Sequence, residues 1–210
     1  MRHMRTEYLY ANDSSTIARA AALLKAGHLV VFPTDTLYGI GAAAFDEAAV
    51  AALYRVKDRP LEKGIPILLA EREDIYQVAR ELPRSAQELL DRFWPGALTL
   101  IVPRHPNLPP NLSPNDNVAV RVPDDDVARA IIHGAGGALA TSSANLSGAP
   151  AARDANEALR AFRGLVAAVV DGGPAPSAVA STIVDCTVDP PQLLRQGVLS
   201  AEALTSFNLV

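Results

Sequence analysis

Apolar residues recur every three to four positions in several segments of the chain, which is the spacing of one face of an α-helix. In the first segment the pattern begins after two serines at 14–15, which suit an N-terminal cap, and it stops at Gly27. In the second, Val50 and Leu53 lie on one face, and Lys57 follows one turn beyond on the same side. Helices are therefore expected at 14–27, 46–57, 125–133 and 154–162, and with apolar faces at 75–79 and 86–93.

Short apolar runs between these segments indicate buried strands. They lie at 28–32, 65–70, 97–102, 118–122, 137–141, 166–170, 181–186 and 192–197. Several strands follow one another without an intervening helix, so a mixed, twisted sheet with helices packed on it fits better than a doubly wound parallel sheet. Residues 33–42 are too rich in Pro, Thr and Gly to be a regular element, and about the last ten residues form a short helix or tail. The expected fold class is α/β of the α+β kind.

The composition is that of an ordinary folded domain. The chain has 210 residues, of which 49% are hydrophobic and 20% charged, so it is long enough to bury a sizeable core in one domain. The longest apolar runs are too short to cross a bilayer, and the first ten residues lack an apolar signal segment. We therefore expect a cytoplasmic protein with no membrane partner. The net charge of -4 argues against a protein that mainly coats nucleic acid, but it is compatible with a local basic cleft.

Several kinds of chemistry are disfavoured by residues that are missing. The single cysteine, Cys186, excludes an internal disulfide, and the four histidines show no metal-binding spacing, so no protein-held metal is expected. There is no Walker sequence, no GxGxxG and no pair of metal-binding carboxylates. No GxSxG motif or Ser-His-Asp arrangement supports a nucleophilic serine. An ATP site in this chain would have to be of an uncommon kind.

Cations gather at two places. KDRPLEKG, at 57–64, brings Lys57, Arg59 and Lys63 together where a helix ends, which suits a polyphosphate. The alternative is a solvated helix end whose basic groups complement the helix dipole. Arg121 lies within the apolar strand VAVRV, where a guanidinium needs an anionic partner, either a structural carboxylate or the carboxylate of a ligand.

Hydroxyl and amide groups follow the ends of other strands. TSSANLSG, at 141–148, could bind phosphate or an adenine edge without adding charge, but the same residue types also form turns. PTDTLYGIG, at 33–41, is either a tight turn with Tyr38 in the core or a functional loop. Ligands bind at strand ends in open α/β sheets, so these segments are candidates for one site.

Six short motifs follow one another along the chain: PTDTLYGIG, KDRPLEK, VAVRVP, SSANLSG, STIVD and RQG. Their order resembles that of the YrdC/TsaC family, the threonylcarbamoyl-AMP synthases, with PTDTxYGxG, KxRP followed by Lys or Asn, AVRxP, SANxSG, STxVD and RxG. The match covers about residues 15–199, and six ordered motifs are far more specific than any one of them. The resemblance implies a single YrdC-like domain over 1–210 with a short tail at 200–210. It also implies a largely open, twisted sheet whose concave face holds a cationic cavity.

The same resemblance assigns roles to individual residues. Thr34 and Arg121 would bind L-threonine, Arg121 through the carboxylate, and Thr141 and Ser181 would complete that pocket. Residues expected to bind ATP are Lys57, Arg59, Lys63, Asn117, Ser143, Asn145 and Arg195. Of these, Lys57 and Arg59 are the expected catalytic residues. No metal ligand is assigned, because Mg²⁺ would arrive bound to ATP.

The resemblance also implies a reaction. The amine of threonine captures bicarbonate or carbon dioxide, and the resulting carbamate attacks the α-phosphate of ATP and displaces pyrophosphate. Both reacting groups are anionic, so the task of the enzyme is mainly to neutralise and align them, and the sequence shows no obvious general base. The adenylate would then pass to a tRNA threonylcarbamoyl transferase, and direct contact of this chain with RNA is optional.

The chain departs from the family pattern at two places, and two alternative functions stay open. Asn117 stands where the family often has Thr, and residues 176–180 stand where it has Gly. A longer branch adds a C-terminal domain, which this chain is expected to lack, and a YciO-like branch loses the KxR and SAN motifs that this chain keeps. The alternatives are a HypF-like domain that forms a carbamoyl-adenylate, and a module that binds double-stranded RNA or tRNA with strong salt dependence.

Overall fold

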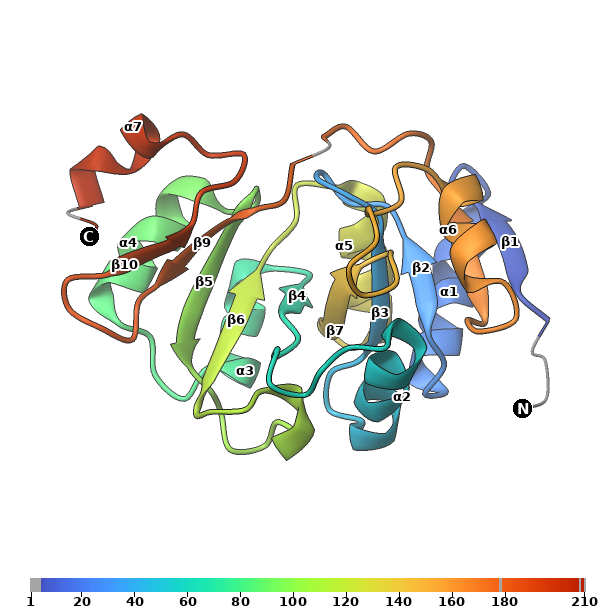
Figure 1. Ribbon diagram of the computed structural model, residues 1–210, viewed down its shortest axis with the longest axis horizontal. Coiled ribbons are helices and arrows are strands. Elements are labelled where there is room, and N and C mark those ends of the chain that lie inside the picture. Colours follow the sequence, from blue (N-terminus) through green and yellow to red (C-terminus); the bar gives the residue numbers. More distant parts are fainter. Residues whose placement is uncertain (1–4, 178, 208, 210) are drawn as a thin grey trace.

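The computed structural model describes residues 5–177, 179–207 and 209, and it is built around a ten-stranded sheet (Figure 1). The strands lie in the order β1-β8-β2-β3-β7-β4-β6-β5-β9-β10. Their bounds are β1 Glu7–Tyr10, β2 Val30–Phe32, β3 Gly39–Ala43, β4 Ile67–Leu69, β5 Leu98–Pro103, β6 Asn117–Arg121, β7 Ala138–Ser143, β8 Ala168–Asp171, β9 Thr182–Asp185 and β10 Gln192–Arg195. Four neighbouring pairs are parallel and five antiparallel, which confirms the predicted mixed sheet.

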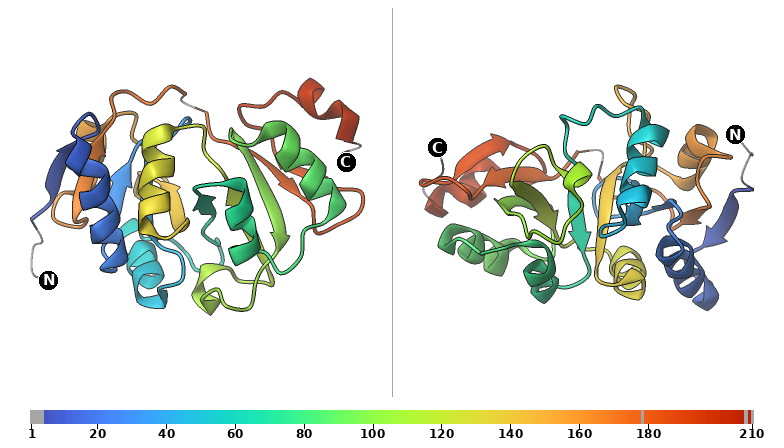
Figure 2. Two further views of the ribbon diagram at one scale, coloured as in Figure 1. Left: turned by 180° about the vertical axis from the view of Figure 1, so that it is seen from behind. Right: turned by 90° about the horizontal axis from the view of Figure 1, so that it is seen from below.

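Helices cover both faces of the sheet. They are α1 Ser14–Lys25, α2 Glu47–Lys57, α3 Ile75–Val78, α4 Arg84–Phe93, α5 Asp126–Ala135, α6 Ala155–Phe162 and α7 Ala201–Leu204. The views from behind and from below show α1, α3, α4 and α5 on one face and α2 and α6 on the other (Figure 2). α1 and α5 pack side by side, and their buried Leu24 and Ile131 share an apolar cluster with Phe32 of the sheet. Burial of these side chains fixes which face of the sheet packs against α1 and α5.

The local sequence explains how α2 presents its last residue. Asp46 caps the helix, since its side chain accepts hydrogen bonds from the amides of Ala48 and Ala49. The predicted apolar face is confirmed, with Val50 and Leu53 fully buried. Asp58 then adopts a left-handed conformation with φ 50° and ends the helix. Lys57 therefore continues the buried face instead of extending into solvent.

Several predicted boundaries were wrong. Part of the segment 33–42 is regular, because residues 39–43 form β3 between β2 and β7; its glycines permit close neighbours, and a Cβ at Gly41 would lie 2.7 Å from the ring of Phe32. The N-cap of α1 is Asp13, whose side chain accepts from the amide of Ser15. α5 continues through Gly134 and ends at Gly136, which has φ 118°. β1 was not predicted at all, because its four residues lie at an edge of the sheet with little apolar signal.

Candidate functional site

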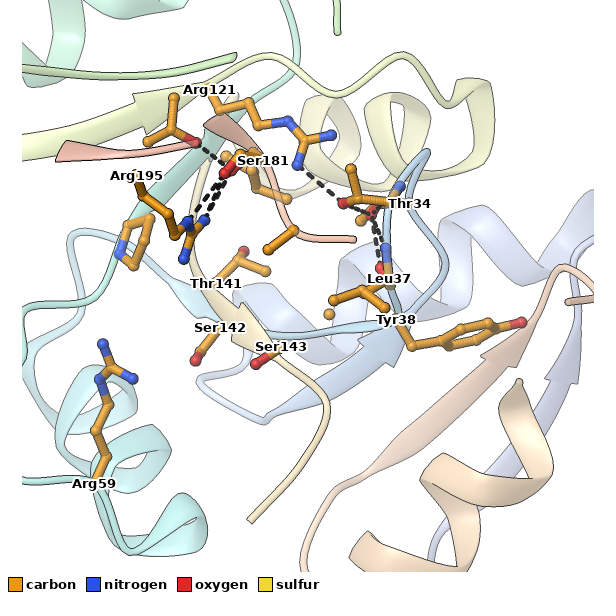
Figure 3. Close-up of a pocket in the computed structure, with 16 residues that line it drawn as sticks. Thr34, Leu37, Tyr38, Arg59, Arg121, Thr141, Ser142, Ser143, Ser181 and Arg195 are labelled. Atoms are coloured by element: carbon orange, nitrogen blue, oxygen red, sulfur yellow. Dashed lines mark hydrogen bonds between the residues drawn. The ribbon is translucent and has the colours of Figure 1, made fainter. Parts of the chain in front are cut away.

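A cavity of about 230 Å³ lies where the PTDT, SAN and C-terminal motifs meet. Sixteen residues line it, and seven of them were predicted as site residues (Figure 3). These seven are Thr34, Arg59, Arg121, Thr141, Ser143, Ser181 and Arg195. The described residues that line the cavity thus include three arginines and no carboxylate. Such a surface is suited to anionic ligands.

Arg121, at the end of β6, is the most confined of these cations, with 5% of its surface exposed. Its Nε donates to the carbonyl oxygen of Gly96 at 2.8 Å, and Nη1 donates to Oγ1 of Thr36 at 3.0 Å. Nη2 forms an ion pair with Oδ1 of Asp35. Burial lowers the pKa of Arg121, and the neighbouring Asp35 opposes that shift. The side chain is therefore oriented by three groups before any ligand arrives.

Asp35 and Thr36 therefore hold the side chain of Arg121 in place, and the sequence did not identify either as a site residue. Of the two partners that the sequence allows for Arg121, the structure shows the structural carboxylate. Two N–H donors of the guanidinium remain for a ligand carboxylate, because it has five and three of them are used here. The sequence feature that could have identified Asp35 is its position as an acidic residue in PTDT, at the end of a buried strand.

Thr34 shapes the loop that faces Arg121. Its hydroxyl donates to the carbonyl oxygen of Leu37 at 2.6 Å and accepts from the amides of Thr36 and Leu37. Gly39 leaves room for the methyl group of Thr141, because a Cβ at Gly39 would lie 2.9 Å from Cγ2 of Thr141. A side chain at position 39 would therefore push against Thr141 in the cavity wall.

Ser181 and Arg195 form the C-terminal wall of the cavity. Arg195 donates from Nη2 to the carbonyl oxygen of Ser181 at 2.8 Å, and the hydroxyl of Ser181 lies 2.8 Å from that of Thr99. Thr99 is another lining residue that the sequence did not reveal. Burial lowers the pKa of Arg195, and repulsion from Arg121 lowers it further. Two arginines close enough to repel each other would be stabilised by an anion between them.

Lys57 lies behind the wall and is not among the lining residues. It is 2% exposed, and Nζ donates to the carbonyl oxygens of Ser143 and Asn145, the latter at 2.8 Å. The ammonium thus supports residues 143–148, which we call the SAN loop. Burial lowers the pKa of Lys57 to about 8, and Arg59 contributes to this shift. The predicted contact of Lys57 with phosphate stays a prediction.

The remaining predicted residues differ in their relation to the cavity. Arg59 lines it, and its guanidinium donates to the carbonyl oxygens of Lys63 and Gly64 at 2.8 and 2.7 Å. Asn145 is not a lining residue, but its Oδ1 accepts from the hydroxyl of Ser143 at 2.5 Å. The structure does not bring the side chain of Lys63 to the cavity, because this residue lies on an exposed turn.

Asn117 is also separated from the cavity. It lines a neighbouring hollow of about 300 Å³ together with Asn115 and Asp185, and Nδ2 lies 3.4 Å from Oγ1 of Thr187. It begins β6, whereas Arg121 ends the same strand, so the length of the strand separates the two. ATP contacts of Asn117 and Lys63 stay predictions.

Other kinds of site find little support within the described part of the chain. Residues 5–177, 179–207 and 209 contain no group of three or more His, Cys, Asp and Glu that could hold a metal ion. Burial raises the pKa of the Cys186 thiol to about 12, so this cysteine is not a thiolate near neutral pH. Among the same residues, the helices are all too short or too polar to span a membrane.

The chain is similar to known proteins over most of its length. The model of the Sua5/YciO/YrdC family, which is described as telomere recombination, matches residues 22–197. A Bacillus subtilis protein named threonylcarbamoyl-AMP synthase is 40% identical over 201 residues, which cover 95% of this chain and 58% of that protein. A Mycobacterium leprae protein named putative threonylcarbamoyl-AMP synthase is 44% identical over 185 residues, with coverage of 88% and 84%.

A similar solved structure is that of P. abyssi Sua5 complexed with L-threonine. The two superpose with a TM-score of 0.92 at 36% identity, over 97% of this chain and 60% of the Sua5 chain. The chain therefore spans somewhat more than half the length of the Bacillus and P. abyssi proteins. The superposition confirms the predicted open, twisted sheet, and the family match confirms the resemblance drawn from the six motifs.

Proposed function

The chain belongs to the Sua5/YciO/YrdC family, and from this membership together with the cavity we propose that it is an L-threonylcarbamoyladenylate synthase. It would convert L-threonine, bicarbonate or carbon dioxide, and ATP into threonylcarbamoyl-AMP and pyrophosphate. The observation that carries the proposal is the convergence of seven predicted residues, contributed by all six motifs, on one cavity lined by arginines. The relatives named for this activity and the threonine complex of P. abyssi Sua5 support it.

Threonine would bind on the side of Arg121. Its carboxylate would accept from N–H groups of Arg121 that are not used by Gly96, Thr36 and Asp35. Thr34 stands near this guanidinium through Thr36, whose hydroxyl is 3.1 Å from that of Thr34. Thr141 and Ser181 would complete the pocket with short polar side chains that leave room for a small amino acid.

ATP would bind on the side of Arg59, Arg195 and the SAN loop. Arg59 and Arg195 would neutralise the phosphates, while Ser143 and Asn145 would contact the nucleotide without adding charge. Lys57 would act by supporting this loop and by its positive charge. Lys63 and Asn117 do not line the cavity, so they would contact parts of ATP that lie outside it. Mg²⁺ would enter as part of the MgATP substrate, and no residue of the chain is assigned to it.

The chemical step needs charge neutralisation more than proton transfer. A carbamate oxygen forms a bond to the α-phosphorus, and the bond from that phosphorus to the oxygen bridging to the β-phosphate breaks, so pyrophosphate leaves with the electron pair. Since the carbamate is already anionic, no residue has to remove a proton from it. Arginines fixed by backbone carbonyls, as Arg59 and Arg195 are, would lower the repulsion between carbamate and triphosphate.

We further propose that the adenylate is used in the cytoplasm by a separate transferase that modifies tRNA. The product is a mixed anhydride of a carbamate and a phosphate, so it is prone to hydrolysis and must be passed on soon after release. Direct binding of RNA is the alternative function, and it would show as RNA affinity that falls steeply with salt. A HypF-like activity would instead use carbamoyl phosphate in place of threonine and bicarbonate.

Pyrophosphate release tests the proposed reaction. With MgATP, L-threonine and bicarbonate all present, we expect release at a rate at least about tenfold above that with either threonine or bicarbonate omitted, because the carbamate requires both. The measurement is a coupled pyrophosphate assay with L-serine and L-valine as matched amino acid controls. Equal release in the absence of threonine would contradict the assignment of the substrate.

A further inference from the structure

The side chain of Tyr38 has none of the substrate contacts proposed above. It is fully buried, and Figure 3 shows its ring directed away from the labelled side chains around the cavity, although the residue itself belongs to the wall. Its hydroxyl donates to the carbonyl oxygen of Gly173 at 2.6 Å and accepts from the amide of Gly172 at 3.2 Å. Burial raises the pKa of Tyr38 to about 12, so the hydroxyl keeps its proton at physiological pH. A tyrosine of the PTDTLYG motif is thus tied to a turn more than a hundred residues away.

The turn at Gly172 and Gly173 is shaped for this contact. Gly173 has φ 86°, a left-handed conformation that glycine adopts without strain, and its amide donates to Oδ1 of Asp171 at 2.9 Å. A Cβ at Gly172 would lie 2.7 Å from Cγ of Pro33, so the turn packs directly against the first residue of the same motif. Pro33 and Tyr38, two residues of the same motif, therefore both contact this turn.

Backbone hydrogen bonds continue from this turn to the SAN loop and back to Tyr38. The amide of Ala175 donates to the carbonyl oxygen of Arg153 at 2.7 Å. The amide of Ala152 donates to the carbonyl oxygen of Ala144 at 2.9 Å. The amide of Ala144 then donates to the carbonyl oxygen of Tyr38 itself at 2.7 Å. The chain segments joined by these bonds form a closed ring, and the Tyr38 hydroxyl is its side-chain link.

Ala144 lies between Ser143 and Asn145, the two residues proposed to contact the nucleotide. We propose that Tyr38 is a positioning residue for ATP, whose hydroxyl closes the ring that holds the SAN loop in its binding geometry. The inference rests on the proposed function, because it names ATP as the ligand of that loop. Arg121 is outside the ring, since its partners are Gly96, Thr36 and Asp35.

The Tyr38→Phe variant tests this role by removing one oxygen atom and keeping the ring in the core. We expect the KM for ATP to rise about tenfold, because the Gly172 amide and the Gly173 carbonyl lose their partner, while the KM for threonine stays within about twofold. Hydrogen exchange measured by mass spectrometry on peptides covering 143–153 and 172–177 should become about tenfold faster.

Thr6→Val is the matched control. The Thr6 hydroxyl also donates to one backbone carbonyl, that of Val166 at 2.8 Å, and accepts from one backbone amide, that of Gly164 at 2.8 Å. It takes no part in the ring, so both KM values and the exchange of the two peptides should match the wild type.

Three results would overturn the inference. They are an unchanged KM for ATP in Tyr38→Phe, equal rises in the KM values for ATP and threonine, and the same changes in Thr6→Val, which would indicate general loosening. An inactive wild-type protein would instead contradict the proposed function. In that case the exchange measurement decides about the ring alone, since unchanged exchange at 143–153 in Tyr38→Phe would overturn it.

Discussion

Replacing Arg121 by alanine is expected to raise the KM for L-threonine by about 100-fold, which corresponds to about 2.8 kcal/mol of lost binding, while the KM for ATP changes by less than about threefold. The physical reason is that a buried, pre-oriented guanidinium would be lost from the position proposed for the carboxylate of threonine. Steady-state kinetics with each substrate varied in turn checks this. Equal effects on both KM values would contradict the carboxylate role.

The loss of folding stability in Arg121→Ala must be distinguished from its loss of affinity for threonine. Without Arg121 the carboxylate of Asp35 loses its ion pair, and breaking a buried pair costs about 3–5 kcal/mol. The double variant Asp35→Asn with Arg121→Ala removes the unpaired charge and should regain much of that loss in urea unfolding, but not the affinity for threonine.

Arg129→Ala is the matched control, since Arg129 also donates from Nε to a backbone carbonyl, that of Ala70, and from Nη2 to the carboxylate of Glu71. Its KM values should match the wild type.

Replacing Gly197 by alanine is the second change with a large expected effect. A Cβ at Gly197 would lie 2.2 Å from the carbonyl oxygen of Ala180 and 2.4 Å from the carbonyl carbon of Ser181. These are backbone atoms, so the added methyl group can be accommodated only if the chain itself moves. We expect a loss of about 3 kcal/mol in the free energy of unfolding and a fall of about 100-fold in kcat/KM for threonine, because Ser181 and its partner Arg195 would shift together.

Urea unfolding and steady-state kinetics check the Gly197→Ala prediction, with Val198→Ala as control. Val198 is half-exposed, and the bond from its backbone amide to the carbonyl of Ala180 survives the truncation, so stability and activity should stay near the wild type. Wild-type activity of Gly197→Ala would show that this close approach does not position the cavity wall.

The elements that the sequence predicted well are those with a strong local signal. The face of α2 follows from its apolar spacing, and that spacing also indicated that Lys57 continues the buried side. What the spacing could not show is the partner of the ammonium. The carbonyls of Ser143 and Asn145 come from a loop more than eighty residues later, and backbone acceptors have no signature in sequence.

The missed features share a dependence on tertiary contacts. Gly39–Ala43 pairs on both sides as a strand despite its glycines, because β2 and β7 supply the hydrogen bonds and Gly41 makes room for Phe32. Asp35 belongs to the site because the fold places Arg121, at the end of β6, beside it. For Tyr38 the sequence left a core role and a functional role open, and the structure combines a buried ring with a hydroxyl that reaches Gly173.

The division of labour in the cavity follows from these contacts. The side chain of Arg121 is oriented by Gly96, Thr36 and Asp35. The positions of Ser143 and Asn145 depend instead on Lys57 and on the backbone hydrogen bonds of Ala144, which lies between them. Threonine and ATP would therefore be held by two separately supported sets of side chains. Variants of one set should leave the affinity for the other substrate nearly unchanged.

Isotopic analysis of the product tests the central claim most directly. The protein is incubated with MgATP, L-threonine and ¹³C-bicarbonate, and the nucleotide products are identified by mass spectrometry. We predict threonylcarbamoyl-AMP that carries one ¹³C atom and forms together with pyrophosphate. An unlabelled adenylate, or carbamoyl-AMP formed only after addition of carbamoyl phosphate, would contradict the account.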